Sequence, residues 1–182
     1  MRKLLLIPLF FFYLSGYGQT DTHINTFLAS IRSELFYDKF DLKKCMMFYE
    51  KIADSKIDLP IVTAYEASAK ALLANYSWNP VSKISYLKEA KVLLAEAVQR
   101  DKENIEIRFL RFYIENSIPA FLGLSKNIEE DKSVILDNID SFDRNALEPG
   151  IVDFIIGYMT SPDVLDKEEI QVVKAKIGLI TE

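Results

Sequence analysis

The sequence has very few of the residues on which compact metal and disulfide sites depend. Its 182 residues include one cysteine, Cys45, and one histidine, His23. A single cysteine excludes an internal disulfide, and a single histidine excludes a multi-histidine zinc site. These two counts exclude zincins, zinc ribbons and the disulfide-rich scaffolds of small secreted proteins. Cys45 lies in an apolar stripe at helical spacing, which is typical of a buried free thiol.

Glycine is scarce as well, with six residues in the whole chain. No Gly-x-Ser-x-Gly elbow, phosphate-binding glycine loop or dinucleotide fingerprint is present. A serine or cysteine nucleophile needs a neighbouring base, and His23 is the only histidine. The sequence therefore predicts a protein that is not an enzyme and that binds no cofactor or metal.

Positive charge is in deficit. Residues 19–182 carry 20 Lys and Arg against 27 Asp and Glu. A chain this acidic is a poor electrostatic match for nucleic acid or for an anionic membrane surface. The length of this segment is that of one domain, and it is long enough to bury a stable core without disulfide bonds or bound metal. We therefore predict a single domain at residues 19–182 that does not bind nucleic acid.

The first 18 residues have the three-part layout of a secretory signal peptide. Arg2 and Lys3 precede the apolar run Leu4–Leu14, and small residues follow up to Gly18. The run is shorter than the roughly 20 apolar residues that a membrane-spanning helix needs. We expect cleavage after Gly18, export to the periplasm or the medium, and no membrane-spanning segment in the processed protein.

Apolar residues recur at helical spacing along the rest of the chain, and runs of strict alternation are short. This pattern predicts an all-α protein. The prolines after residue 18 fall between the periodic segments, where proline is tolerated in a helix's first turn and ends the preceding helix. We predict eight helices, at residues 21–37, 40–55, 60–77, 81–100, 104–117, 127–142, 149–160 and 166–180. Their short connections favour antiparallel neighbours.

Two helix starts carry recognisable capping residues. Asn79 precedes Pro80, which gives a side-chain cap before a proline at the first helical position. Asp166 and Glu169 have the spacing of a capping box. The helix behind this box has an apolar stripe on one side and is predicted to pack on that side only.

The helix at 104–117 is apolar around nearly its whole circumference, which predicts a position between other helices. Its polar residues form a narrow seam of Arg108, Arg111 and Glu115. A buried guanidinium is costly unless it is paired, and the acids at 129–131 on the following helix are candidate partners. We favour this structural pairing. The alternative is that Arg108 and Arg111 bind the carboxylate of a ligand, such as the C-terminus of a peptide.

Two loops carry apolar side chains that are candidate contact sites. Trp78 lies in a proline loop and is the aromatic residue most expected to be exposed. The loop at 117–124 contains Ile118, Phe121 and Leu122, which we expect to be covered by the flanking helices. Gly123 in this loop is expected to have a positive φ or a close backbone neighbour.

Residues 90–104 resemble the second helix and inter-repeat turn of a tetratricopeptide repeat. Ala90, Leu94 and Ala97 match the small, large and small packing positions, and residues 101–104 resemble the aspartate-proline-x-asparagine turn, with Lys102 where proline is usual. Such repeats are units of two antiparallel helices. The resemblance implies a short α-solenoid whose centre is one such unit.

The stretch 107–135, together with a signal peptide that ends in glycine and is followed by Gln19, resembles a set of small exported all-helical proteins of Bacteroidota. This resemblance implies a compartment and a fold, and it implies no mechanism.

Three functions compete on this sequence. We favour a non-catalytic interaction protein that binds an unknown protein or peptide, with Arg108, Arg111 and Trp78 as candidate binding residues, because stacked helix pairs form a concave surface. The first alternative is a helical binder of a small apolar or carboxylate-bearing ligand. An enzyme that uses the acids at 129–131 with the two arginines comes third, since acids in a helix's first turn are explained by the helix dipole alone.

Overall fold

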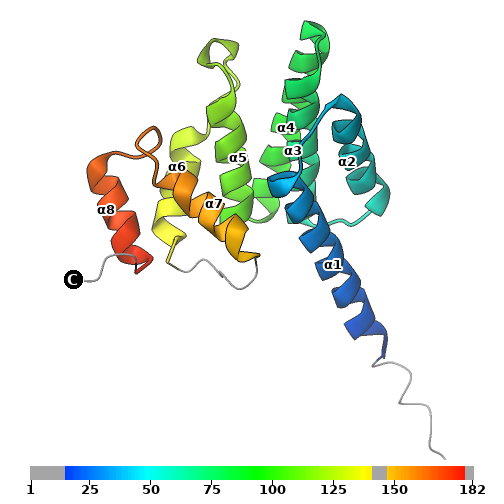
Figure 1. Cartoon of the computed structure of the whole chain (residues 1–182), viewed down its shortest axis with the longest axis horizontal. Coiled ribbons are helices and arrows are strands. Elements are labelled where there is room, and N and C mark those ends of the chain that lie inside the picture. Colours follow the sequence, from blue (N-terminus) through cyan, green and yellow to red (C-terminus); the bar gives the residue numbers. More distant parts are fainter. Residues whose placement is uncertain (1–14, 141–146, 179–182) are drawn as a thin grey trace, which may run out of the picture.

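A computed structural model describes residues 15–140 and 147–178, with side chains from residue 22 onward. The described residues form eight α-helices and one short 3₁₀ helix (Figure 1). The α-helices are α1 (Ser15–Tyr37), α2 (Leu42–Ser55), α3 (Pro60–Tyr76), α4 (Pro80–Arg100), α5 (Ile105–Ser117), α6 (Ile128–Asn138), α7 (Pro149–Met159) and α8 (Lys167–Lys176). The 3₁₀ helix η1 (Ala120–Leu122) lies between α5 and α6. The structure confirms the all-α class and the eight predicted helices, whereas the predicted signal peptide lies largely outside the described residues.

Helix starts follow the local chemistry of the sequence. The side chain of Asn79 accepts hydrogen bonds from the backbone N–H groups of Val81 and Ser82, and Asn104 caps α5 in a similar way. Asp166 and Glu169 form the predicted capping box of α8. Prolines stand at the first position of α3, α4 and α7, where no intrahelical N–H bond is lost.

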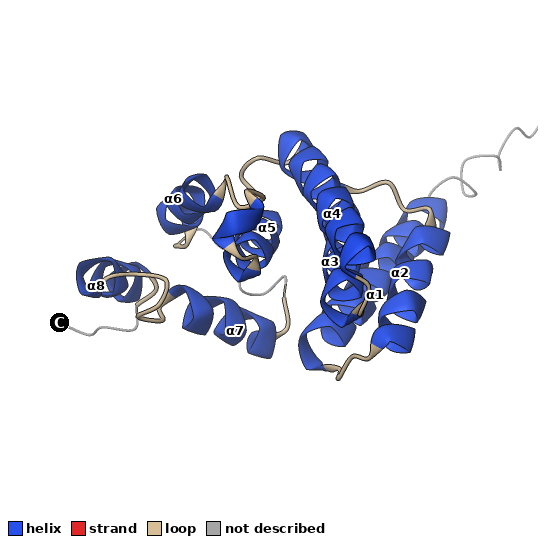
Figure 2. Ribbon diagram, turned by 90° about the horizontal axis from the view of Figure 1, so that it is seen from above, coloured by secondary structure: helices blue, strands red, loops and turns tan. Residues whose placement is uncertain are grey.

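The helices form two groups, α1–α4 and α5–α8, which Figure 2 shows on opposite sides of the molecule. Each group has its own apolar core. The first core is made mainly by α1–α4, and the second by α5–α8. Helix α5 contributes to both, since Ile107 and Leu110 are buried in the first core and Phe109 and Phe112 in the second. The prediction that α5 is buried between neighbours is therefore confirmed.

Helices adjacent in sequence pack against each other, most extensively α3 with α4, α5 with α6, and α2 with α3. Helix α5 also contacts α3 and α4, which joins the two groups. The upper end of α5 stands apart from the paired upper ends of α3 and α4, and the connecting loops stand at the top of Figure 1. A cavity lined by residues of these three helices lies there.

Candidate functional site

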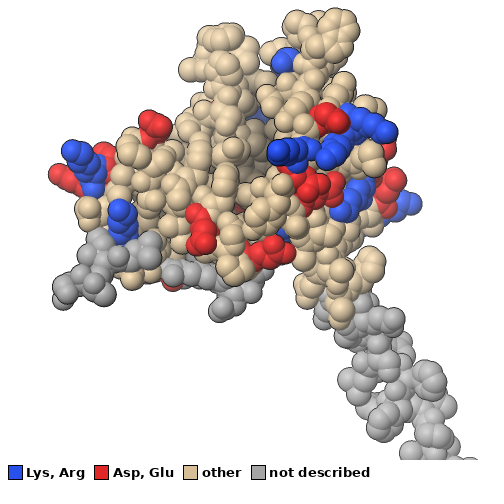
Figure 3. All heavy atoms as spheres, in the orientation of Figure 1, with Lys and Arg blue, Asp and Glu red and all other residues tan. Residues whose placement is uncertain are grey.

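An apolar groove lies between the two helix groups. Its volume is about 790 Å³, and its walls come from α1, α3, α4, α5, the η1 segment and α7. Figure 3 shows the hollow between two projections at the top of the molecule, with walls that are mainly uncharged. Ligand pockets in proteins commonly have volumes between about 300 and 1,000 Å³. The groove is therefore large enough for a ligand or for an apolar segment of another protein.

The wall between the groups contains packed aromatic rings. Phe109 and Tyr113 of α5 and Phe154 of α7 all line the groove. The ring centroids of Tyr113 and Phe154 lie 5.8 Å apart in an edge-to-face arrangement, and those of Phe36 and Phe154 lie 5.2 Å apart. Burial raises the pKa of Tyr113 above its usual value, so the phenol stays neutral over a wide pH range. These ring contacts make this wall of the groove apolar and well packed.

Two exposed aromatic side chains stand at the rim. Trp78 is 87% exposed and Phe121 is 86% exposed. Groove-lining residues lie near each one in the sequence, Asn75 and Pro80 for Trp78, and Pro119 and Leu122 for Phe121. The predicted exposure of Trp78 is confirmed. The expectation that the flanking helices cover Phe121 is wrong, because η1 turns its middle residue outward while Leu122 faces the groove.

Gly123 ends η1 with φ at 63°, in the left-handed region that glycine adopts without a Cβ penalty. Its backbone N–H donates to the carbonyl of Ala120. The side chain of Lys91 on α4 donates to the carbonyl of Leu124 at 3.0 Å, which fixes the end of this segment against α4. Phe121 is therefore held at the rim on a short structured turn.

Lys83 of α4 is the charged residue of the groove wall. Its ammonium group lies 3.4 Å from the backbone carbonyl of Asn75. Within residues 22–140 and 147–178, no acidic side chain forms an ion pair with it, and none of the groove-lining residues is Asp or Glu. No local sequence pattern marks Lys83, because its surroundings are assembled from several helices.

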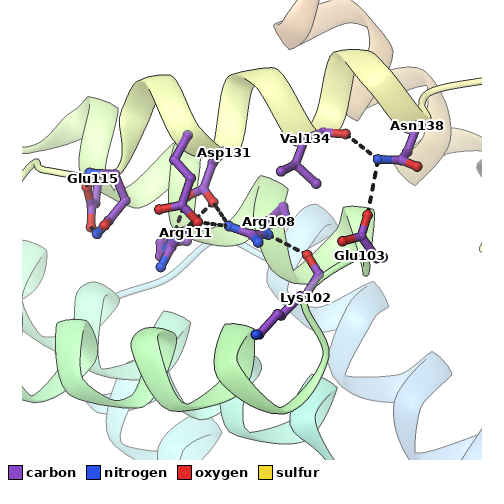
Figure 4. Close-up of polar contacts among 10 residues, drawn as sticks. Lys102, Glu103, Arg108, Arg111, Glu115, Asp131, Val134 and Asn138 are labelled. Carbon is purple, nitrogen blue, oxygen red and sulfur yellow. Dashed lines mark hydrogen bonds and ion pairs between the residues drawn. The ribbon is translucent and has the colours of Figure 1, made fainter.

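The two arginines of the α5 seam lie away from the groove lining, against α6 (Figure 4). Asp131 is fully buried, and its carboxylate accepts hydrogen bonds from Arg108 at 2.9 Å and from Arg111 at 2.6 and 2.7 Å. Glu130 accepts a further bond from Arg108 at 2.5 Å. That bond lowers the pKa of Glu130 below its usual value. The predicted structural pairing is confirmed.

The two buried glutamates of α5 also have hydrogen-bond partners within the fold. Glu115 accepts bonds from the side chain and the backbone N–H of Asn127 at 2.7 and 2.8 Å. Glu106 accepts two bonds from Arg32 at 2.6 and 2.8 Å and one from Tyr65 at 2.7 Å. Across the described residues, no buried side-chain nitrogen or oxygen lacks a partner. Arg108 and Arg111 therefore hold α5 against α6. Trp78 does not line the groove, and it lies on an exposed loop next to the lining residue Pro80.

Within the part of the chain that the structure describes, no cluster of three or more His, Cys, Asp and Glu side chains could hold a metal ion. Over the same residues, no helix has the length and apolar content to cross a bilayer. Comparisons with family models, with curated proteins and with solved structures find no match to this chain. Functional inference therefore depends on the groove and its rim.

Proposed function

We propose that this protein is an exported, non-catalytic interaction domain that holds an apolar segment of a partner protein in the groove between its two helix groups. The observation that supports this most is the pair of exposed aromatic side chains at the rim, Trp78 and Phe121. A small molecule enclosed in the groove would leave both of them in water. A partner chain that continues past the groove would cover them, and buried aromatic anchors carry much of the binding energy at protein interfaces.

The composition of the groove walls supports a helical partner segment. Its walls come from several helices and are mainly aliphatic and aromatic. In helix-in-groove recognition, an amphipathic helix inserts apolar residues at positions i, i+3 or i+4, and i+7 into such a surface. The charged groups of α5 are already paired inside the fold, which supports a binding role for the groove rather than an acid–base reaction at the arginine seam.

We also propose the finer architecture that the sequence implies: a single domain at residues 19–182 built as a short α-solenoid with a tetratricopeptide-like unit at α3–α4. Ala90, Leu94 and Ala97 of α4 are buried in the first core, and Asn104 donates to Asp101 at 2.9 Å in the turn before α5. Export by the N-terminal segment places the partner in the periplasm or the medium.

Site-specific photo-crosslinking tests this function. A photoreactive amino acid is placed at Trp78, at Phe121 or at Val92 in the full chain, which is expressed in its own host and irradiated. Val92 is 67% exposed on α4, and no residue within four positions of it lines the groove, so it serves as the control position. We expect one abundant protein to be crosslinked from positions 78 and 121 and not from 92.

Crosslinking of the same proteins from all three positions would contradict a specific partner at the rim.

A second candidate, a binder of a small apolar ligand, is favoured by the volume of the groove, about 790 Å³. That candidate predicts no protein adduct at either rim position. It also predicts that organic extraction of the purified native protein releases a stoichiometric small molecule.

A further inference from the structure

The described side chains that line the groove include a positive charge and no negative one, which constrains the charge of the occupant. Acidic residues outnumber basic ones in the whole chain, 27 to 22, yet among the described residues no acid lines the groove and one lysine does. The nearest polar group that Lys83 contacts is a backbone carbonyl, that of Asn75, at 3.4 Å. Lys83 is partly buried, so an anion placed beside it would be only partly screened by water.

Two other partly buried lysines of this protein have anionic partners. Lys70 pairs with Glu89 at 2.8 Å, and its ammonium lies 4.0 Å from the ring centroid of Tyr49. Lys132 pairs with Glu169 at 2.9 Å. Lys83 differs from these two, because no carboxylate of the described residues pairs with it. Complementarity of charge across an interface sets specificity and steers encounter.

Building on the function proposed above, we infer that the partner segment is an apolar helix carrying a carboxylate that pairs with Lys83. The aliphatic and aromatic walls contact the apolar face of the segment. The Lys83 ammonium pairs with its carboxylate near the rim, where Trp78 lies. Trp78 lies on the loop between Asn75 and Pro80, and both of these line the groove beside Lys83. An acid in the first turn of a helix is also stabilised by that helix's own dipole, so the test peptides carry their acid at that position.

Two synthetic peptides of one amphipathic sequence test this inference. Both have leucines at helix-in-groove spacing, blocked ends and a neutral coumarin at the C-terminal end, and they differ only by Glu or Gln in the first turn. Binding to the full-length protein is measured by fluorescence anisotropy. We expect the Glu peptide to bind about fivefold more tightly than the Gln peptide, and added salt to reduce this ratio.

Two lysine variants serve as a matched pair. Lys83→Met keeps the apolar stem and removes the charge, so the two peptides should bind it with equal affinity. Lys88→Met changes an exposed lysine of the same helix that does not line the groove, and it should keep the wild-type preference for Glu. The far-UV circular dichroism spectrum and melting temperature of both variants confirm that they fold.

The outcomes separate this inference from the function on which it rests. Equal affinity of the wild-type protein for both peptides would overturn the carboxylate assignment and leave the interaction function intact. A preference for Glu that survives in Lys83→Met would also overturn it, since the acid would then be recognised elsewhere. If neither peptide binds, both proposals fail, and binding of dodecanoate measured by titration calorimetry would then support the small-ligand candidate.

Discussion

At the scale of single residues, the fate of a charged side chain depends on whether a partner is built into the fold. Arg108 and Arg111 lie on a buried helix, and both are bonded to Asp131. Lys83 lies at a groove wall without a carboxylate partner among the described residues. Two arginines that the sequence marked as candidate binding groups are therefore part of the α5–α6 interface, and a lysine that it did not mark faces the groove.

Replacing Arg108 with Ala should destabilise the fold strongly. The change removes one partner of a buried ion pair and leaves Asp131 with less compensation, which typically costs about 3–5 kcal/mol. Urea unfolding followed by far-UV circular dichroism measures the loss. Arg100→Ala is the control, because Arg100 pairs with Asp58 at the surface and should cost less than about 1 kcal/mol. Equal losses in the two variants would contradict the structural role of Arg108.

Tyr65 makes the stability of the fold sensitive to alkaline pH. Burial, with Glu106 beside it, raises the pKa of the Tyr65 phenol well above its usual value of about 10. The folded state therefore keeps this proton at pH values where the unfolded chain loses it. The contribution to stability is fully present below about pH 10 and is lost as pH rises through the raised folded-state pKa.

Comparison with Tyr65→Phe isolates this effect. At about pH 8 the variant should be less stable by about 0.5–1.5 kcal/mol, because it lacks the hydrogen bond to Glu106. Between about pH 8 and pH 11, the stability of the wild-type protein should fall more steeply than that of the variant. Parallel decline of the two proteins in urea unfolding would contradict the assignment to Tyr65.

Single-residue predictions from the sequence succeeded where the partners are local. The i, i+3 spacing of Arg108 and Arg111 faces the next helix along the chain, and that helix begins with the acids Glu130 and Asp131. The environment of Lys83 could not be predicted in this way, because the groove brings together residues from α1 to α7. The expected burial of Phe121 is wrong for a related reason, since the orientation of this side chain depends on the turn geometry of η1.

At the scale of helices, boundaries follow from caps and prolines, which act within one turn. The predicted starts at Pro60, Pro149 and the Asn79–Pro80 pair agree with the structure to within one residue. Helices α6 and α8 end at Asn138 and Lys176, four residues before the predicted ends at 142 and 180. The apolar spacing continues past both ends, with Ile139 and Ile177 buried in the second core, so periodicity alone overestimates the helix length.

Helix α8 should depend on its capping box. It has Val173 as its only fully buried residue within Lys167–Lys176, so tertiary packing contributes little to its stability. Asp166→Ala removes a side chain that accepts bonds from the backbone N–H groups of Glu168 and Glu169 and should cost about 1 kcal/mol. Amide hydrogen exchange should show faster exchange throughout α8. Glu168→Ala, which leaves the box intact, should leave that exchange nearly unchanged.

At the scale of the whole molecule, α5 is the element that joins the two cores. Ile107 and Leu110 pack in one core, and Phe109 and Phe112 pack in the other. Loss of either core exposes part of α5, so we expect the two groups to unfold in a single cooperative transition. The pairing of sequential helices was predictable from short connections, whereas the divergence of the two groups around the groove depends on contacts between distant segments.

Thiol labelling tests this cooperativity with one reporter in each group. Cys45 is fully buried in α2, and burial raises the pKa of its thiol to about 11, so it should react only after unfolding. A second protein, with Cys45→Ala and Met159→Cys, places the only thiol in α7, where Met159 is fully buried. In each protein, the urea midpoint from labelling should coincide with that from far-UV circular dichroism. A midpoint for α7 well below its own dichroism midpoint would show that the second group unfolds separately.

The exposed position of Trp78 has a practical consequence for every stability measurement on this protein. Trp78 is the only tryptophan of the chain, and its indole is already in water in the native state. Its emission should therefore be as red-shifted in the folded protein as in urea, and a tryptophan-based melting curve should show almost no transition. A folded sample would look denatured by this common assay, so its integrity is better judged by circular dichroism or by the slow exchange of its amides.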